Sequence, residues 1–142
     1  MREIKFRAKR LDNNEWVYGN CIIDNWGDEN NNIIYGILED RKAPSFIENW
    51  IPVKVNNNTL GQFTGLKDKN DKEIYEGDVV RIFAYNFDEE EFFVVKYNND
   101  TARYELVSDD LCVSFDNVYN YEVEIIGNIY DNPELLEANN ED

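Results

Sequence analysis

The chain has 142 residues, and its 30 acidic and 14 basic residues give a formal net charge of −16, with no histidine in the sequence. The negative charge argues against nucleic acid and anionic membranes as partners, because both are bound through positive patches. The lack of histidine excludes a histidine general base, a Ser-His or Cys-His nucleophile and every histidine metal site.

Apolar and polar residues alternate with a period of two from the start of the chain, which predicts β-strands. The first predicted strand has two different faces. Its apolar face is made by Ile4, Phe6 and Ala8, and its charged face by Glu3, Lys5, Arg7 and Lys9. We therefore expect a half-buried strand whose outer face is wet and positive.

Further strands are expected at 16–23, after a turn at 12–14, and at 32–38, after a loop at 24–31. Residues 44–50 fit either a short helix or a strand. Residues 51–55 are expected to be extended, partly because a proline at 52 disfavours the helical region for the residue before it.

After a polar break at 56–58, the segment GQFTGLKDKNDKEIYEGDVVRI at 61–82 contains four turn signals. The pattern then predicts strands at 79–85, 92–97, 102–107 and 121–130. Short strands joined by tight turns are typical of a small, strongly bent barrel.

A short helix is expected at the end of the chain. Asn132 can cap it, Pro133 fits its first position, and Leu135 and Leu136 would dock it. The sequence thus predicts an all-β fold with one short C-terminal helix.

The predicted organisation has two parts. Residues 1–60 would form an N-terminal hairpin or sheet subdomain, and residues 61–142 a small bent β-barrel subdomain with the helix. The same pattern also fits one compact unit. The longest apolar run, 92–95, is too short for a membrane-spanning helix, and the N-terminus lacks the apolar stretch of a signal peptide. We expect a cytoplasmic protein.

The acidic residues are concentrated in the second half of the chain. Residues 1–80 hold 14 acids and 11 bases, residues 81–142 hold 16 acids and three bases, and residues 1–10 carry a net +4. One interpretation is head-to-tail self-association, in which the positive first strand of one copy meets the acidic barrel of the next. The other is that an acidic surface keeps the protein soluble.

No residue pattern predicts catalysis, a metal or a cofactor, so we assign no catalytic or metal-binding residue and expect no enzyme. The acidic clusters 88–91 and 109–110 fall at predicted turns and lack the ligand spacing of a calcium loop. A glycosidase-type carboxylate pair is disfavoured in so small a domain. Lys67 and Lys69 suit an exposed edge strand better than an anionic ligand.

The two cysteines, Cys21 and Cys112, lie far apart in the sequence and belong to no C-x-x-C pair. We expect both to be buried free thiols, as is usual in a reducing compartment. A single disulfide is the alternative.

Three blocks of the chain carry a resemblance to a known family. They are REIKFRAKRLDNNEWVYG at 2–19, GQFTGLKDKNDKEIYEGDVVRI at 61–82 and IIGNIYDNPELLE at 125–137. In these blocks the chain resembles the YopX-like proteins of phages and prophages, and it departs from them at Asp71, where the family usually has glycine. The resemblance implies a mostly β architecture with barrel-like parts, an oligomer, and no established catalytic residues.

Together these features predict a phage or prophage accessory protein that acts by binding and self-association, without catalysis. One alternative is an inhibitor of host defence that imitates the charge of nucleic acid on a basic host protein. Another is a small-ligand binder, for instance of a nucleotide held between aromatic rings and lysines such as Lys67 and Lys69. The sequence identifies neither the binding residues nor the partner.

Overall fold

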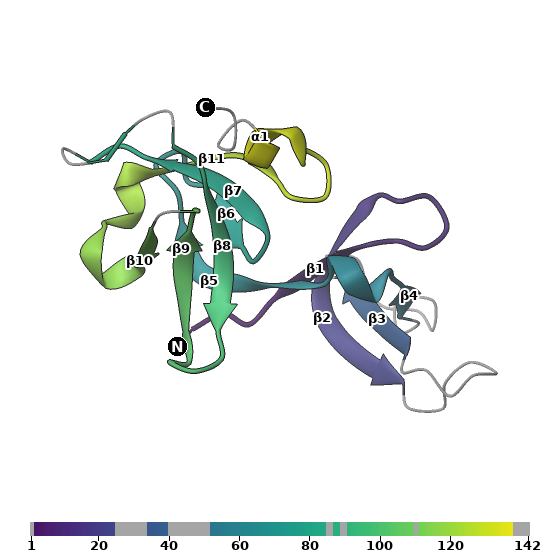
Figure 1. Ribbon diagram of the computed structural model, residues 1–142. Helices are drawn as coiled ribbons and strands as arrows, with labels where there is room; N and C mark the ends of the chain where they lie inside the picture. Colours follow the sequence, from purple (N-terminus) through teal and green to yellow (C-terminus); the bar gives the residue numbers. More distant parts are fainter. Residues whose placement is uncertain are drawn as a thin grey trace. The chain divides into compact units, whose positions relative to one another are not determined.

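The computed structural model describes residues 2–24, 34–39, 52–84, 87–88, 91–109 and 111–137. The chain divides into two compact units, Met1–Phe63 and Thr64–Asp142. The described residues form eleven strands and one α-helix, so the all-β prediction is confirmed (Figure 1). The residues at 44–50, which fitted a helix or a strand, lie outside the described part of the chain.

The N-terminal unit is an antiparallel sheet in which neighbouring strands follow the order β4-β3-β2-β1. These strands are β1 (Phe6–Lys9), β2 (Trp16–Asp24), β3 (Ile34–Glu39) and β4 (Val53–Lys54). The 3-10 turn η2 (Asn57–Thr59) leads to β5 (Gly61–Lys67), whose first residues pair with β1. The core of this unit is formed by Ala8, Val17, Ile37 and Val55.

The prediction of a wet outer face on the first strand is wrong. Arg7 and Lys9 are only 6% and 8% exposed, and Ala8 between them is fully buried. The cause is the register of the β1–β2 hairpin, which pairs Lys9 directly with Trp16 and so brings an indole ring onto the charged face. Both faces of β1 are therefore covered.

The C-terminal unit contains a second antiparallel sheet, with the strand order β10-β9-β8-β7-β11. Its strands are β7 (Asp78–Ile82), β8 (Phe93–Asn98), β9 (Arg103–Val107), β10 (Cys112–Ser114) and β11 (Val123–Asn128). The strand β6 (Glu73–Tyr75) neighbours β5 in the first sheet. The core is centred on residues such as Ile74, Ile82, Phe93, Leu106 and Val123.

The sheet is open and does not form the small bent barrel that the sequence pattern favoured. Its end strands are β10 and β11, which do not pair with each other. The outer edge of β11 is occupied instead by the β5–β6 hairpin: Lys69 donates its backbone N–H to the carbonyl of Val123 (2.8 Å), and the Asp68 carboxylate accepts from the N–H of Ile125 (2.9 Å). A covered edge resists pairing with further strands.

The segment between β10 and β11 forms two 3-10 turns, η3 (Phe115–Asn117) and η4 (Asn120–Glu122). The strand predicted at 121–130 therefore begins only at Val123, and the short strand β10 was not predicted. Figure 1 draws these turns as yellow-green coils beside β10.

The predicted C-terminal helix is present as α1 (Glu134–Glu137). Asn132, expected to cap this helix, accepts instead from the backbone N–H of Asn128 (3.2 Å) with its side-chain oxygen. Gly127 allows this approach, because a Cβ there would lie 2.5 Å from that oxygen and 2.9 Å from Leu135 Cδ1. The tail thus docks onto the end of β11.

Candidate functional site

Three cations of the N-terminal unit lie against aromatic rings. The guanidinium carbon of Arg7 is 4.6 Å, and Lys9 Nζ 5.4 Å, from the ring centroid of Trp16. Lys5 Nζ lies 5.8 Å from the centroid of Phe63. A cation over an aromatic face is attracted by the ring quadrupole. The cations of the first strand therefore contact aromatic rings of their own unit.

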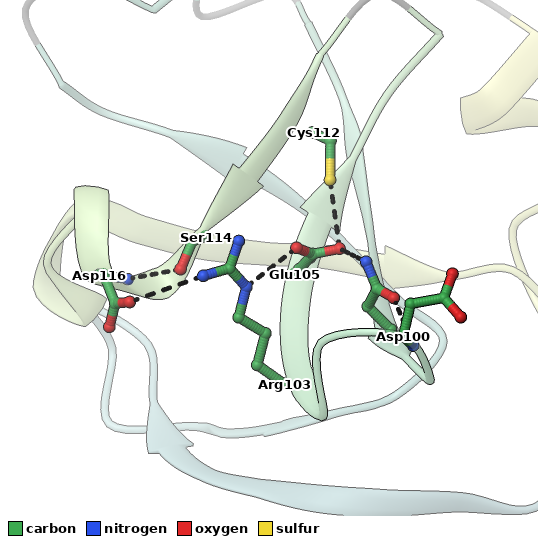
Figure 2. A network of polar contacts seen from close by, with 7 residues as sticks. Asp100, Arg103, Glu105, Cys112, Ser114 and Asp116 are labelled. Atoms are coloured by element: carbon green, nitrogen blue, oxygen red, sulfur yellow. Dashed lines mark hydrogen bonds and ion pairs between the residues drawn. The ribbon is translucent and has the colours of Figure 1, made fainter.

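A buried carboxylate, Glu105 on β9, organises the polar network of the C-terminal unit (Figure 2). It is 5% exposed. It accepts hydrogen bonds from Asn98 Nδ2 (2.8 Å), Arg103 Nε (3.1 Å) and Cys112 Sγ (3.2 Å). These donors come from β8, β9 and β10, so one side chain ties three neighbouring strands together.

The network shifts the acidity of two of its members in opposite directions. The hydrogen bond from Asn98, then that from Cys112 and the Arg103 contact, lower the pKa of Glu105 against the opposing effect of burial. The hydrogen bond to Glu105, together with burial and the negative charge of Glu105, raises the pKa of Cys112. Cys112 therefore stays a thiol at neutral pH, which disfavours nucleophilic chemistry.

Both cysteines are free in the structure. Cys21 is half-buried, and burial raises the pKa of its thiol. Cys112 is exposed, so the prediction that it is buried is wrong. The reason is its position on the short edge strand β10, which has a neighbour on one side only.

The same network extends to the turn after β10. Arg103 Nη1 lies 4.0 Å from an oxygen of Asp116, and Ser114 Oγ accepts from the backbone N–H of Asp116 (3.2 Å). Figure 2 shows the guanidinium of Arg103 between Glu105 and Asp116. Two carboxylates thus hold one guanidinium at this end of the sheet.

The carboxylates of the 61–82 block serve the backbone. Asp68 is 4% exposed, and its Oδ1 accepts from the N–H groups of Asn70 (2.8 Å) and Lys72 (2.9 Å). Asp78 is also buried, and its Oδ2 accepts from the N–H of Tyr75 (2.7 Å). This block is therefore a set of turn-forming devices rather than a set of reacting groups.

The two lysines considered as anion ligands are engaged within the chain. Lys67 Nζ lies 3.9 Å from the carboxylate of Asp71. Lys69 Nζ lies 4.2 Å from the ring centroid of Phe83, and the guanidinium of Arg81 lies 5.1 Å from the same centroid. The structure does not bring the two lysine side chains to a shared aromatic ring, so it gives no support to a nucleotide between them.

The acidic clusters are described only in part. Asp88 is exposed, and Glu91 accepts from Ser108 Oγ (2.8 Å). Asp109 is exposed, whereas residues 89, 90 and 110 lie outside the described part of the chain. Among the described residues, no three cysteine or carboxylate side chains converge on a position for a metal ion. Within the same ranges, no helix is long and apolar enough to cross a membrane.

One surface feature was not anticipated from the sequence. Tyr119 and Tyr121 are 64% and 62% exposed, and their rings stack with centroids 5.0 Å apart and planes 8° apart. The sequence pattern assigned Tyr121 to a strand, where tyrosines two residues apart also share a face. Both rings are instead exposed, Tyr119 just before the 3-10 turn η4 and Tyr121 within it.

Charge divides unevenly between the two units. Residues 1–63 contain nine acids and eight bases, a net charge of −1, whereas residues 64–142 contain 21 acids and six bases, a net charge of −15. Nearly all the excess negative charge therefore belongs to the C-terminal unit.

Comparisons with known proteins give a family and a structural relative. The model of the family described as "YopX protein" matches residues 5–137. The crystal structure of protein EF1440 from Enterococcus faecalis is 27% identical in sequence and has a TM-score of 0.57, covering 96% of this chain and 99% of that one. The comparison with curated proteins gave no match.

Proposed function

The chain belongs to the YopX protein family, and we propose that it acts by binding a basic protein partner through its C-terminal unit, without catalysis. In this proposal it is an accessory protein of a phage or prophage that works in the bacterial cytoplasm. The observation that carries the proposal is the net charge of −15 on one compact unit. Such a field attracts basic partners and repels nucleic acid.

The buried acids of this unit have structural roles, which argues against a role in catalysis. Asp68 and Asp78 accept backbone N–H groups, and Glu105 accepts three side-chain donors. Each of these carboxylates thus has a structural task. A general acid or base would instead need to face a substrate within hydrogen-bond reach.

Self-association is the second proposal, and its basis is now the N-terminal unit. Head-to-tail contact through the first strand loses its support because Arg7 and Lys9 are buried. Contact between two C-terminal units would oppose two charges of the same sign. The N-terminal unit has a net charge of only −1 and exposes large apolar side chains, namely Ile4, Leu11, Tyr18 and Ile22. Light scattering at low and high salt would detect such an oligomer, and a monomer at all salts and high concentration would exclude it.

Capture from a bacterial lysate tests the main proposal. Immobilised protein is incubated at about 50 mM and about 500 mM salt, because screening weakens contacts between exposed charges, and captured proteins are identified by mass spectrometry. We expect a set of basic proteins at low salt that is largely lost at high salt. A captured set that is not basic, or that salt leaves unchanged, would overturn the proposal.

Two charge-matched variants assign the interaction to a unit. One neutralises the acids at 88–91 with one asparagine and three glutamines, and the other neutralises Glu3, Asp12, Glu15 and Glu48 in the same way. We expect reduced capture by the first and unchanged capture by the second. Equal capture by both would contradict binding through the C-terminal unit.

A further inference from the structure

The segment between β10 and β11 is held firmly at its base. Val118 and Val123 are buried in the core of the C-terminal unit, and Phe115 packs against the same cluster. Glu122 accepts from the N–H of Phe83 (2.6 Å) with its carbonyl and donates its own N–H to the carbonyl of Tyr119 (2.9 Å). The residues between the anchors therefore have a fixed backbone.

On this base, Tyr119 and Tyr121 form a stacked pair that the fold does not use. Both rings are more than three-fifths exposed, and they lie almost parallel at 5.0 Å. Tyrosines presented with a fixed geometry give a large contact area at a low entropic cost, which is why they are frequent at the centre of binding surfaces. The pair is thus pre-organised for a ligand.

The surroundings of the pair are anionic. Asp116 and Glu122 lie in the two 3-10 turns that flank Tyr119, and Asp116 is exposed. Desolvation, together with the negative charge of Glu122, raises the pKa of Tyr121, so its hydroxyl stays neutral. An aromatic stack beside carboxylates suits a cation, because the ring face and the carboxylate both attract positive charge.

An arginine of the same unit already lies between two carboxylates. Arg103 reaches between Glu105 and Asp116, at 3.1 Å and 4.0 Å (Figure 2). This contact shows that carboxylates of this unit accept a planar, charged donor group. Arginine also stacks on aromatic rings better than lysine does.

We propose that Tyr119 and Tyr121, with the carboxylate of Glu122, bind an arginine side chain on a segment of a protein partner. This inference rests on the proposed function and names the site and the side chain that it recognises. A nucleic acid is disfavoured as occupant because phosphates would meet a unit of charge −15, and a second copy is disfavoured because it carries the same charge.

The test uses three fluorescent peptides of equal length and one oligonucleotide. The peptides carry arginine, lysine or citrulline at the same positions, since citrulline keeps the planar shape of arginine and loses its charge. The oligonucleotide is single-stranded DNA. Fluorescence anisotropy with the full chain is expected to rank the arginine peptide above the lysine peptide, with no binding of citrulline or DNA.

Three variants locate the site. Tyr119→Ala/Tyr121→Ala removes the stack and is expected to weaken arginine-peptide binding by about tenfold, since each exposed ring contributes a small cation–π term. Tyr119→Phe/Tyr121→Phe keeps both ring faces and should bind within about twofold of the wild type. Tyr97→Ala removes another exposed tyrosine of the same unit, which packs edge-to-face on Tyr104, and should also bind like the wild type.

Circular dichroism confirms that each variant is folded before its affinity is compared. Loss of binding in the alanine pair alone supports the site. Equal binding of the arginine peptide by all variants overturns the site and leaves the proposed function standing. Failure of the wild type to bind either cationic peptide at low salt overturns both. Binding of DNA through the tyrosine pair would overturn the choice of a protein partner.

Discussion

In the N-terminal unit the buried charges are the cations Arg7 and Lys9, beneath the ring of Trp16, whereas in the C-terminal unit they include the carboxylates Asp68 and Glu105, which accept several hydrogen bonds. Burying an ion is costly unless its charge is compensated. An aromatic face compensates a cation in the first case, and N–H and S–H donors compensate an anion in the second. One chain thus uses both solutions.

The difference decides what each unit offers to a partner. The first unit covers cations of its leading strand, and its acids and bases nearly balance. The second unit buries three of its carboxylates, Asp68, Asp78 and Glu105, while its net charge is −15. The formal charge of −16 for the whole chain therefore reflects the C-terminal unit, whereas the N-terminal unit is nearly neutral.

Removing the carboxylate of Asp68 from the C-terminal unit should have the largest effect on the free energy of unfolding. Asp68→Ala leaves the N–H groups of Asn70, Lys72 and Ile125 without their carboxylate partner and removes one of the two contacts at the edge of β11. We expect a loss of about 3 kcal/mol in the free energy of unfolding, measured by urea denaturation.

Two further aspartate substitutions serve as comparisons for the loss of stability in Asp68→Ala. Asp68→Asn keeps one oxygen acceptor and should lose less stability than the alanine variant. Asp100→Ala, in the exposed β8–β9 turn, should change the free energy of unfolding by less than about 0.5 kcal/mol. A loss at Asp68 no larger than that at Asp100 would show that the carboxylate does not organise the hairpin.

Removing the aromatic cover of the N-terminal unit should have the next largest effect. Trp16→Ala takes away the ring that lies over both Arg7 and Lys9, and we expect a loss of about 2 kcal/mol because the ring is half-buried. Leu11→Ala, at an exposed apolar side chain of the same hairpin, is the control and should be close to neutral. Equal losses in the two variants would contradict a role of the indole in covering the cations.

The period of two was enough to predict the strands, because alternation reports which residues share a face. It could not tell what covers the second face, so the burial of Arg7 and Lys9 beneath Trp16 was missed. The pattern also could not predict whether the sheet closes into a barrel, because closure depends on the edge of β11. That edge is contacted by the carboxylate of Asp68, which lies 57 positions before its partner Ile125 in the chain.

The candidate site was the least predictable part. Tyr119 and Tyr121 lie in a segment where alternation continues into β11, and only the 3-10 turn at 120–122 separates them from the strand. A turn of three residues has no hydrophobic period of its own. The residues that the sequence did single out, Lys67 and Lys69, are engaged with Asp71 and Phe83.

The pH dependence of stability tests the role of the buried carboxylate Glu105 in the C-terminal unit. Its pKa is lowered in the folded state, so its contribution is complete above the usual glutamate pKa and is lost as the pH falls through the lowered value. Urea denaturation at several pH values should show a flatter acid limb for Glu105→Gln than for the wild type. Glu134→Gln, in the exposed part of α1, should leave that limb unchanged.

The reactivity of the Cys112 thiol tests its hydrogen bond to Glu105 without unfolding the protein. Glu105 raises the pKa of this thiol, so Glu105→Gln should increase the thiolate fraction and the rate at which iodoacetamide alkylates Cys112. The half-buried Cys21 lies in the other unit and should keep its rate. An unchanged rate at Cys112 would mean that the hydrogen bond between the thiol and Glu105 does not persist in solution.

The smallest expected effect concerns the turn of the hairpin that Asp68 closes. Asp71 has a φ of 65°, a left-handed conformation that costs energy for a residue with a Cβ. Asp71→Gly should therefore raise the free energy of unfolding by about 0.5 kcal/mol, even though the exposed contact with Lys67 is lost. Asp71→Ala also loses that contact but keeps the Cβ, so it should be less stable than the glycine variant. Alanine as stable as glycine would show that the left-handed backbone at this turn is not a source of strain.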